Sequence, residues 1–280
     1  MKKFAVAITA TIGLAAVASP AWAQDDRASH FDGPYVSGTF GRTLQNNTQD
    51  RIAFDTDRNG SYDNTVRNGA GVDVFGSNFC QGAANGPTPA TGCSRNNGDD
   101  WEYSGRIGYD RRISNNVVGG LVIEVGKSES SDQVSAFSST PARYTLGREL
   151  DVAVSLRGRL GYTPGGGALF YVTAGPSYAK IDHSFSTSNG ANAFNEVNDG
   201  KWVWGGQAGG GTEIMLTNKV SLGLEYLFSR YRDNKYRVEV TQGSALASNA
   251  FLLNGGGTNL RPSRTNYDSH SLRASLSYQF

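Results

Sequence analysis

The sequence contains no long apolar run beyond its first residues, few cysteines and histidines, and almost no net charge. After residue 23, no 18 consecutive residues of the 280-residue chain are apolar, which excludes a membrane-spanning helix there. The two cysteines and three widely spaced histidines do not form a cysteine metal cluster or a soft-metal site. The formal charge of +1 at pH 7 gives no reason to expect a nucleic acid as a partner.

Glycine and aromatic residues are abundant instead. Glycine accounts for 36 of the 280 residues, and aromatic residues make up 11% of the chain. This composition favours short alternating strands, in which glycine permits strand tilt and tight packing within a narrow barrel. The negative mean hydropathy is compatible with a membrane protein, because only every second strand residue of a barrel faces lipid.

The last ten residues, 271–280, alternate strictly between polar and apolar side chains. This period of two predicts a strand with one apolar face and an aromatic end, which is typical of transmembrane β-barrels. Leu276, Tyr278 and Phe280 resemble the carboxy-terminal signal that bacterial outer-membrane barrels present to their insertion machinery. The alternative is an ordinary amphipathic strand at the end of the chain.

The first 23 residues have the pattern of a cleavable signal peptide. Lys2 and Lys3 precede an apolar stretch over residues 4–17, and Ala21-Trp22-Ala23 fits a small-x-small cleavage site. We therefore expect a signal peptide over residues 1–23, followed by a short amino-terminal segment over residues 24–32. A retained membrane anchor is the alternative.

Alternating side chains along most of the chain predict eight strands, including the terminal one. Alternation is weak over residues 168–181, so the faces of that strand are not assigned. In the expected strand over residues 150–162, Asp151 is placed on the polar face with Ser155 and Arg157. Residues 236–241 and 250–253 could form an extra hairpin, which would give ten strands. We interpret them instead as extensions of the last long connection. The eight expected strands cover residues 34–42, 101–111, 117–126, 150–162, 168–181, 201–216, 220–231 and 271–280.

The connections alternate between short and long, which favours short periplasmic turns and long extracellular loops. Tryptophans 101, 202 and 204 are expected at the outer membrane boundary, and Tyr162, Tyr278 and Phe280 at the inner one. The predicted fold is all-β: an eight-stranded transmembrane antiparallel up-and-down β-barrel over residues 33–280. Its long outer loops cover about residues 43–100, 127–149, 182–200 and 232–270.

Four segments carry a resemblance to a known family. They are Gly33-Pro34-Tyr35-Val36, the glycine-rich strand through Gly211-Thr212-Glu213, residues 220–226 and the terminal strand. They resemble the small outer-membrane β-barrel superfamily, which includes the opacity-type porin family and the outer-membrane-protein-A-like barrel domain. The resemblance extends over residues 33–280. We expect no peptidoglycan-binding domain after the barrel, unlike in the two-domain members.

The resemblance implies a location and partners. We expect the chain in the outer membrane of a Gram-negative bacterium, after export through the periplasm. The expected partners are outer-membrane lipid, the barrel-assembly machinery during insertion, and a host or surface ligand that binds the loops. Since one barrel fold serves many functions, the resemblance says little about activity.

Seven charged residues are expected on the inward face of the barrel, because each would cost about 2–4 kcal/mol at the lipid midplane. One interpretation is a structural ion-pair network that fills the narrow lumen of an eight-stranded barrel. The other is a narrow polar pore whose selectivity these charges set. The seven are Arg106, Glu124, Arg157, Arg159, Glu213, Glu225 and Arg273.

The first long loop contains two further features. Cys80 and Cys93 are the only cysteines, and in an exported chain they predict a disulfide. An EF-hand-like pattern upstream suggests a calcium loop, although Val66 stands where a bidentate Glu is usual. The alternative is a polar turn between short hairpin strands, which the same residues favour. The expected calcium ligands are Asp55, Asp57, Asn59, Ser61 and Asp63.

The sequence gives little support for catalysis, and we expect no enzyme and no cofactor apart from this calcium ion. His30, His183 and His270 are far apart, although Asp182-His183-Ser184 and Asp268-Ser269-His270-Ser271 could contribute to a site at the rim. Three functions remain open. The first is a structural or surface-interaction role with slow permeation of small solutes. The second is a general diffusion porin with a narrow charged lumen, and the third is a rim-located lipid or peptide hydrolase.

Overall fold

The computed structural model describes residues 30–44, 51–94 and 100–280. The predicted signal peptide therefore lies outside the described residues. The described chain consists of strands and connections, with one short 3-10 helix at Pro89–Thr91. Within these ranges, no helix is long and apolar enough to cross a membrane.

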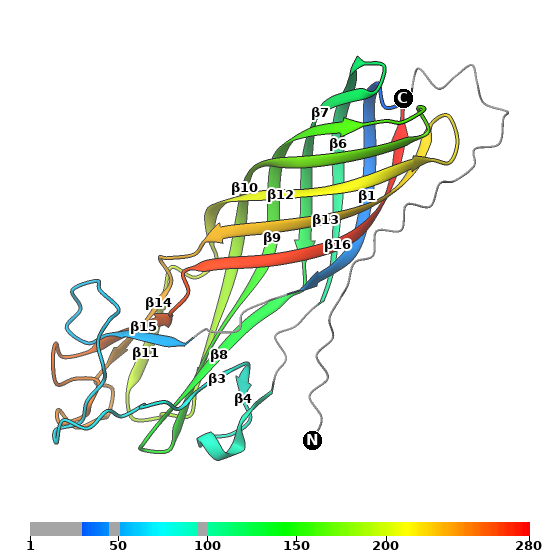
Figure 1. Cartoon of the computed structure of the whole chain (residues 1–280). Helices are drawn as coiled ribbons and strands as arrows, with labels where there is room; N and C mark the ends of the chain where they lie inside the picture. Colours follow the sequence, from blue (N-terminus) through cyan, green and yellow to red (C-terminus); the bar gives the residue numbers. More distant parts are fainter. Residues whose placement is uncertain (1–29, 45–50, 95–99) are drawn as a thin grey trace.

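Eight long strands pair in a closed antiparallel ring (Figure 1). Each strand of the ring pairs with the next, β10 pairs with β9, and β16 pairs with β1. Closure leaves no unpaired edge along the ring, as a lipid environment requires. The predicted eight-stranded barrel is confirmed. The strands are β1 (Gly33–Leu44), β6 (Asp100–Ser114), β7 (Val117–Ser128), β9 (Ala142–Tyr162), β10 (Ala168–Thr187), β12 (Lys201–Met215), β13 (Val220–Arg232) and β16 (Asn266–Gln279).

Side chains alternate between an apolar outer face and a polar interior. On β1, Ser37 and Thr39 are buried, whereas Phe40 is exposed. Along β16 the same alternation buries Arg273 and exposes Leu276. An exposed apolar exterior around a polar interior is the arrangement of a lipid-embedded barrel.

Asp151 does not lie where the alternation predicts. A β-bulge pairs Val152 with Lys180 and Leu150 with Ile181, so Asp151 is an extra residue in its strand. Its carboxylate is partly exposed and lies 3.1 Å from the ammonium of Lys180. The prediction that Asp151 shares the inner face was wrong, because the bulge interrupts the period of two.

The short turns lie at one end of the barrel, and the long connections lie at the other (Figure 1). Aromatic side chains gather near both ends. Near the long connections, Phe40 stacks on Trp101 at 5.0 Å and Tyr178 on Trp202 at 5.0 Å between ring centroids. At the turn end, Tyr278 contacts Phe280 at 5.4 Å. Such aromatic belts are typical of the two membrane interfaces.

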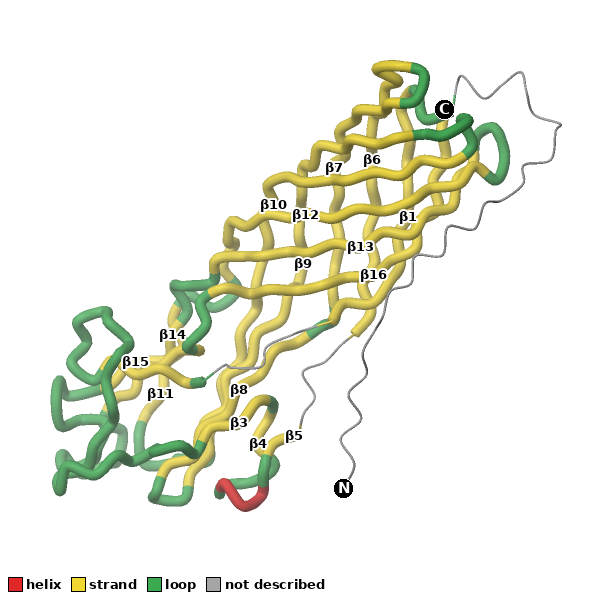
Figure 2. The backbone as a smooth tube through the Cα atoms, in the orientation of Figure 1, coloured by secondary structure: helices red, strands yellow, loops and turns green. Residues whose placement is uncertain are grey.

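The long connections fold into a structured unit beyond the barrel, which we call the outer head (Figure 2). Its main sheet has the order β11-β14-β15-β2. A second part forms where β9 and β10 continue past the barrel and β8 and β3 pair alongside β9. The strands of the head are β2 (Ile52–Asp55), β3 (Phe79–Gln81), β4 (Ala83–Ala84), β5 (Cys93–Ser94), β8 (Ser131–Ser138), β11 (Ala193–Val197), β14 (Arg237–Thr241) and β15 (Thr258–Pro262).

The outer head has a hydrophobic core of its own, built from fifteen buried residues. Phe75 lies at its centre and contacts the rings of Phe54, Tyr144 and Phe251, with centroid distances of 4.6, 5.3 and 6.0 Å. Aromatic pairs of this kind add to the stabilisation from burial alone. The long connections are therefore a packed unit rather than separate loops.

The strand boundaries differ from the prediction mainly in the head. β9 begins at residue 142 instead of 150, and β10 continues to 187 instead of 181. Residues 236–241 largely form β14 of the head sheet, and residues 250–253 form turns. These segments therefore add no hairpin to the barrel, which has eight strands rather than ten.

Leu224 offers a test of the lipid-facing surface. It is 51% exposed on β13, between the aromatic ends of the barrel. We expect Leu224→Arg to lower the free energy of unfolding in lipid vesicles by about 2–4 kcal/mol, because the charge would lie in hydrocarbon. Urea unfolding monitored by tryptophan fluorescence measures this change.

The matched control is Leu246→Arg, the same substitution at a residue of the head that is 79% exposed. We expect it to change stability by less than about 0.5 kcal/mol, as for ordinary surface substitutions. Equal effects at the two positions would contradict the assignment of Leu224 to the lipid face.

Candidate functional site

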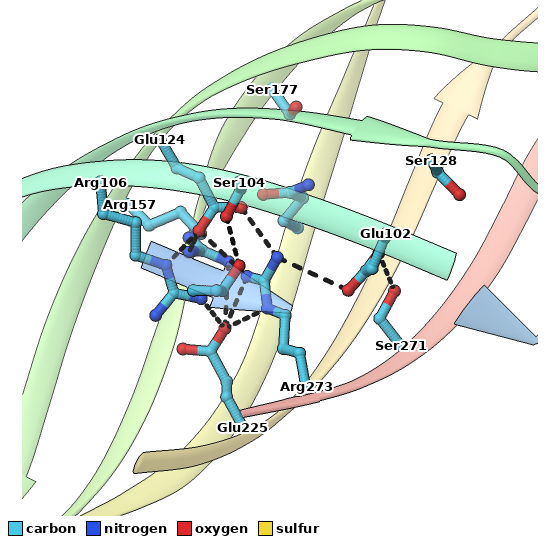
Figure 3. Close-up of polar contacts among 12 residues, drawn as sticks. Glu102, Ser104, Arg106, Glu124, Ser128, Arg157, Ser177, Glu225, Ser271 and Arg273 are labelled. Carbon is cyan, nitrogen blue, oxygen red and sulfur yellow. Dashed lines mark hydrogen bonds and ion pairs between the residues drawn. The ribbon is translucent and has the colours of Figure 1, made fainter. Parts of the chain in front are cut away.

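A compact cluster of five charged residues occupies the barrel lumen (Figure 3). Strand register places Arg106 opposite Glu124 and Glu225 opposite Arg273, and β9 contributes Arg157. All five side chains are at most 5% exposed. The period of two on five strands thus directs five charges to one level of the lumen. We call these residues the lumen cluster.

The pairs within the lumen cluster are short and shared. Glu124 lies 2.8 Å from both Arg157 and Arg273, and it also accepts a hydrogen bond from Arg106. Glu225 lies 2.7 Å from Arg106 and 2.6 Å from Arg273. Each carboxylate therefore bridges several guanidinium groups across the barrel. Such charge-assisted, multiply bonded pairs are the strong kind.

Glu102 completes the charge balance of the lumen cluster. One of its oxygens lies 3.8 Å from Arg273, and the other accepts hydrogen bonds of 2.7 Å from Thr43 and Ser271. Three arginines then face three glutamates. Near-neutrality lowers the cost of burying these charges, which is high for an unpaired ion.

A second group of charges lies nearer the turn end. Arg159 lies 3.1 Å from Glu213 and 3.5 Å from Asp110. Tyr171 links the two groups, since its hydroxyl donates to Glu225 at 2.7 Å while the Arg159 guanidinium lies 4.0 Å from its ring centroid. The seven residues predicted to face inward are thus all buried, in two linked groups.

The two groups also include four residues that are not among the seven predicted lumen charges: Glu102, Asp110, Tyr35 and Tyr171. Glu102 and Asp110 share the alternation of β6 with Arg106, so the same pattern could have added them. The two tyrosines depend on glycines on neighbouring strands: a Cβ at Gly108 would overlap the ring of Tyr35, and one at Gly211 would crowd Tyr171. No strand pattern reveals such space before the register is known.

The space on the outer side of the lumen cluster is small. A cavity of about 40 Å³ lies on its outer side, which is room for about three water molecules. Towards the head, Leu150, Tyr231 and Tyr267 belong to a buried apolar cluster. Towards the turns, Phe31 and Leu169 belong to another. The charged interior is therefore flanked by apolar packing at both ends.

The three histidine rings contact different partners in the described chain. The His183 ring makes a hydrogen bond of 3.0 Å to Asp233 and stacks on Tyr236, with ring centroids 3.9 Å apart. Its neighbour Asp182 pairs instead with Lys180. The His183 side chain is 2% exposed and packs where the barrel meets the head.

The other two histidines have different surroundings. His270 bonds the Tyr226 hydroxyl at 2.6 Å, and its neighbour Asp268 pairs with Arg230 at 2.8 Å. His30 bonds the carbonyl oxygen of Gly166. None of these ring contacts within the described residues involves a serine hydroxyl, which a serine nucleophile would require.

The predicted disulfide between Cys80 and Cys93 is present. It joins β3, which pairs with β8, to the small β4–β5 hairpin. The bond links this loop to the outer head and lowers the conformational entropy of the unfolded chain.

The predicted calcium loop forms a hydrogen-bonded turn. Asp55 is fully buried, and its carboxylate accepts N–H donors from the backbone of Asn59 and Gly60 and from the Asn259 amide. In the part of the chain that the structure describes, no three His, Cys, Asp or Glu side chains are grouped to hold a metal ion. Calcium binding by Asp55, Asp57, Asn59, Ser61 and Asp63 stays a prediction.

Comparison with known proteins agrees with this architecture. Residues 9–280 match the family model of the outer membrane protein beta-barrel domain. The 31 kDa outer-membrane immunogenic proteins of Brucella melitensis biotype 1 and Brucella suis biovar 1 are each 27% identical over 175 residues, or 62% of this chain. The chain spans about 64% of the length of these curated relatives.

Two solved structures are similar over most of the chain. The outer membrane protein OprG from Pseudomonas aeruginosa is 14% identical, with a TM-score of 0.47, and the match covers 90% of this chain and 97% of OprG. Neisserial surface protein A is 12% identical, with a TM-score of 0.37, and the match covers 89% and 98%. The family match, together with the closed eight-stranded ring, shows that the chain belongs to the outer-membrane β-barrel domain family and resides in the outer membrane of a Gram-negative bacterium.

Proposed function

We propose that this protein is a surface-interaction barrel, in which the barrel anchors the outer head in the membrane and the head contacts a ligand. The observation that carries the proposal is the lumen cluster, whose five buried side chains are joined across the barrel. A lumen that these ion pairs hold closed favours a stabilising role over the transport of solutes.

A diffusion pore needs a continuous water path and binding sites weak enough to release the solute. Arg273 instead contacts two carboxylates at 2.6 and 2.8 Å, and the cavity beside it measures about 40 Å³. Opening a path would separate buried ion pairs, which is costly. These features support the closed-lumen proposal over the general diffusion porin.

The outer head supports the second half of the proposal. Loops that only connect strands have no need of a fifteen-residue hydrophobic core, which this head has. Binding residues are often placed on loops held by a rigid scaffold. The extended strands β9 and β10 and the disulfide provide such a scaffold.

We also infer that the terminal strand is recognised during membrane insertion. Leu276, Tyr278 and Phe280 are exposed on the outside of the barrel near its turn end. Their resemblance to the insertion signal of outer-membrane barrels supports the barrel-assembly machinery as the partner during insertion.

Electrical recording in a planar bilayer tests the closed lumen. We expect the refolded wild-type protein to give no discrete conductance steps once insertion is verified. The double variant Glu225→Ser with Arg273→Ser removes one facing pair of the lumen cluster without changing the net charge. We expect this variant to conduct, because the smaller side chains leave room for water.

The control is Arg230→Ser with Asp268→Ser, which removes a facing pair from the same two strands on the outer surface. We expect it to stay silent. Wild-type steps whose ion selectivity changes with Glu225→Gln would overturn the proposal and favour a porin.

A further inference from the structure

A polar groove opens on the outer head, between the turn after β2 and the strands β14 and β15. Its volume is about 460 Å³, within the range of small-ligand sites of about 300–1,000 Å³. Four cationic side chains line it: Arg58, Lys235, Arg237 and Arg261. We call this feature the head groove. It lies outside the lumen cluster, and the role of the lumen does not explain it.

The head groove carries an excess of positive charge. Asp55 is the one carboxylate among the residues that line it, and its oxygens accept three N–H donors from the head. Glu239 lies 2.7 Å from Arg237 and neutralises that cation. Arg58, Lys235 and Arg261 then leave the groove suited to an anion.

Two of these cations are held in position before any ligand binds. The Arg58 guanidinium donates to the carbonyl oxygen of Val240 at 3.1 Å. The Arg261 guanidinium donates to the carbonyl oxygen of Asn234 at 3.2 Å and lies 3.9 Å from the ring centroid of Tyr62. Groups fixed in this way lose little conformational freedom when they bind a ligand.

The remaining lining suits a hydroxylated ligand. Tyr62 is half-buried, and this burial raises the pKa of its phenol, which therefore stays protonated and able to donate a hydrogen bond. An asparagine amide carries two N–H donors and one acceptor oxygen, the combination that sugar hydroxyls need. Asn59, Asn198 and Asn259 each donate one N–H within the head, so each retains a second N–H. The asparagines that line the groove are Asn59, Asn198, Asn234 and Asn259.

We propose that the head groove binds an anionic saccharide, a sugar ring that carries a phosphate or a carboxylate. Arg58, Lys235 and Arg261 hold the anionic group, and the asparagine amides and Tyr62 bind the hydroxyls. The inference rests on the proposed function, because it names the ligand class of the head. A concave site of this size fits one or two sugar rings better than a protein surface, which is flatter and larger.

Ligand-observed NMR of the full-length protein, refolded in a polyoxyethylene detergent, tests the proposal. The probes are glucose 6-phosphate, glucuronate, glucose and inorganic phosphate. We expect binding of glucose 6-phosphate, glucuronate or both, at least tenfold tighter than binding of glucose or phosphate alone. The comparison of the two acids identifies the preferred anionic group.

Two variants locate the binding in the groove. We expect Lys235→Gln and Arg261→Gln each to weaken binding of the acidic sugar at least tenfold. Lys235 is exposed, so its substitution tests the groove even if Arg261→Gln disturbs β15. The control is Arg143→Gln, a cation of the same head that does not line the groove, and it should bind like the wild type.

Three results would overturn the proposal: equal affinity for glucose and its 6-phosphate, affinity for inorganic phosphate alone as high as for the acidic sugars, and binding that Lys235→Gln leaves unchanged. Failure here is distinguishable from failure of the closed-lumen part of the proposed function, which the bilayer recording decides independently. A silent bilayer with no sugar binding would reject the ligand class and retain the closed barrel.

Discussion

The substitution Glu225→Gln is expected to lower the free energy of unfolding of the barrel by about 3–5 kcal/mol, because it leaves buried arginines without a counter-charge. Glu225 is 2% exposed at its side chain and contacts Arg106 and Arg273 at 2.7 and 2.6 Å. The amide keeps the size of the carboxylate, so a packing defect contributes little. Urea unfolding in lipid vesicles, monitored by tryptophan fluorescence, gives the value.

The control for this prediction is Glu239→Gln, which removes a carboxylate from a partly exposed pair with Arg237 in the head. An exposed pair contributes about 0–1 kcal/mol, so a small change is expected. A loss below about 1 kcal/mol for Glu225→Gln would mean that water solvates the lumen arginines, in conflict with the 3–5 kcal/mol expected for a buried pair.

Phe75→Ala is the second substitution with a large expected effect. Phe75 is 2% exposed and contacts four other rings at the centre of the head core. Truncation of a buried phenylalanine costs about 3–5 kcal/mol, from lost burial and the cavity left behind. We expect this loss to open the head and leave the barrel folded, since Phe75 packs within the head core and not in the lumen.

Limited proteolysis of the protein in vesicles separates the two effects. In Phe75→Ala, we expect rapid cleavage in the head while the barrel strands remain protected by lipid. Val72→Ala is the matched control, because Val72 lies three residues away and is 57% exposed. If the Phe75→Ala barrel lost its protection together with the head, the two parts would form one cooperative unit, against our expectation.

Alternation along the barrel strands made the membrane-embedded part predictable. A closed barrel in lipid needs apolar side chains outside and tolerates polar ones inside, so the period of two assigns a face to each residue. Arg106, Glu124 and Arg273 were placed inside on this basis alone, and all three are buried. The prediction of the face of Asp151 was wrong, because a single bulge shifts the register locally.

The outer head was much less predictable. Its main sheet uses strands of four or five residues, such as Ile52–Asp55 and Arg237–Thr241. Segments this short show too few alternations to distinguish a strand from a loop. Their partners also lie far away in the chain: β2 pairs with β15, about two hundred residues later. The head groove, with cations at positions 58, 235 and 261, depends wholly on these pairings.

The sequence by itself determined that the chain forms eight amphipathic strands with an apolar outside, short turns at one end and long connections at the other. These properties are local, because each follows from neighbouring residues and the geometry of a strand. Only the tertiary structure decided which charges meet. Closing the ring brings Arg106 to Glu225, 119 residues apart, and packing the connections together creates the head core and its groove. Such contacts depend on strand order and register across the whole barrel, which no local pattern specifies.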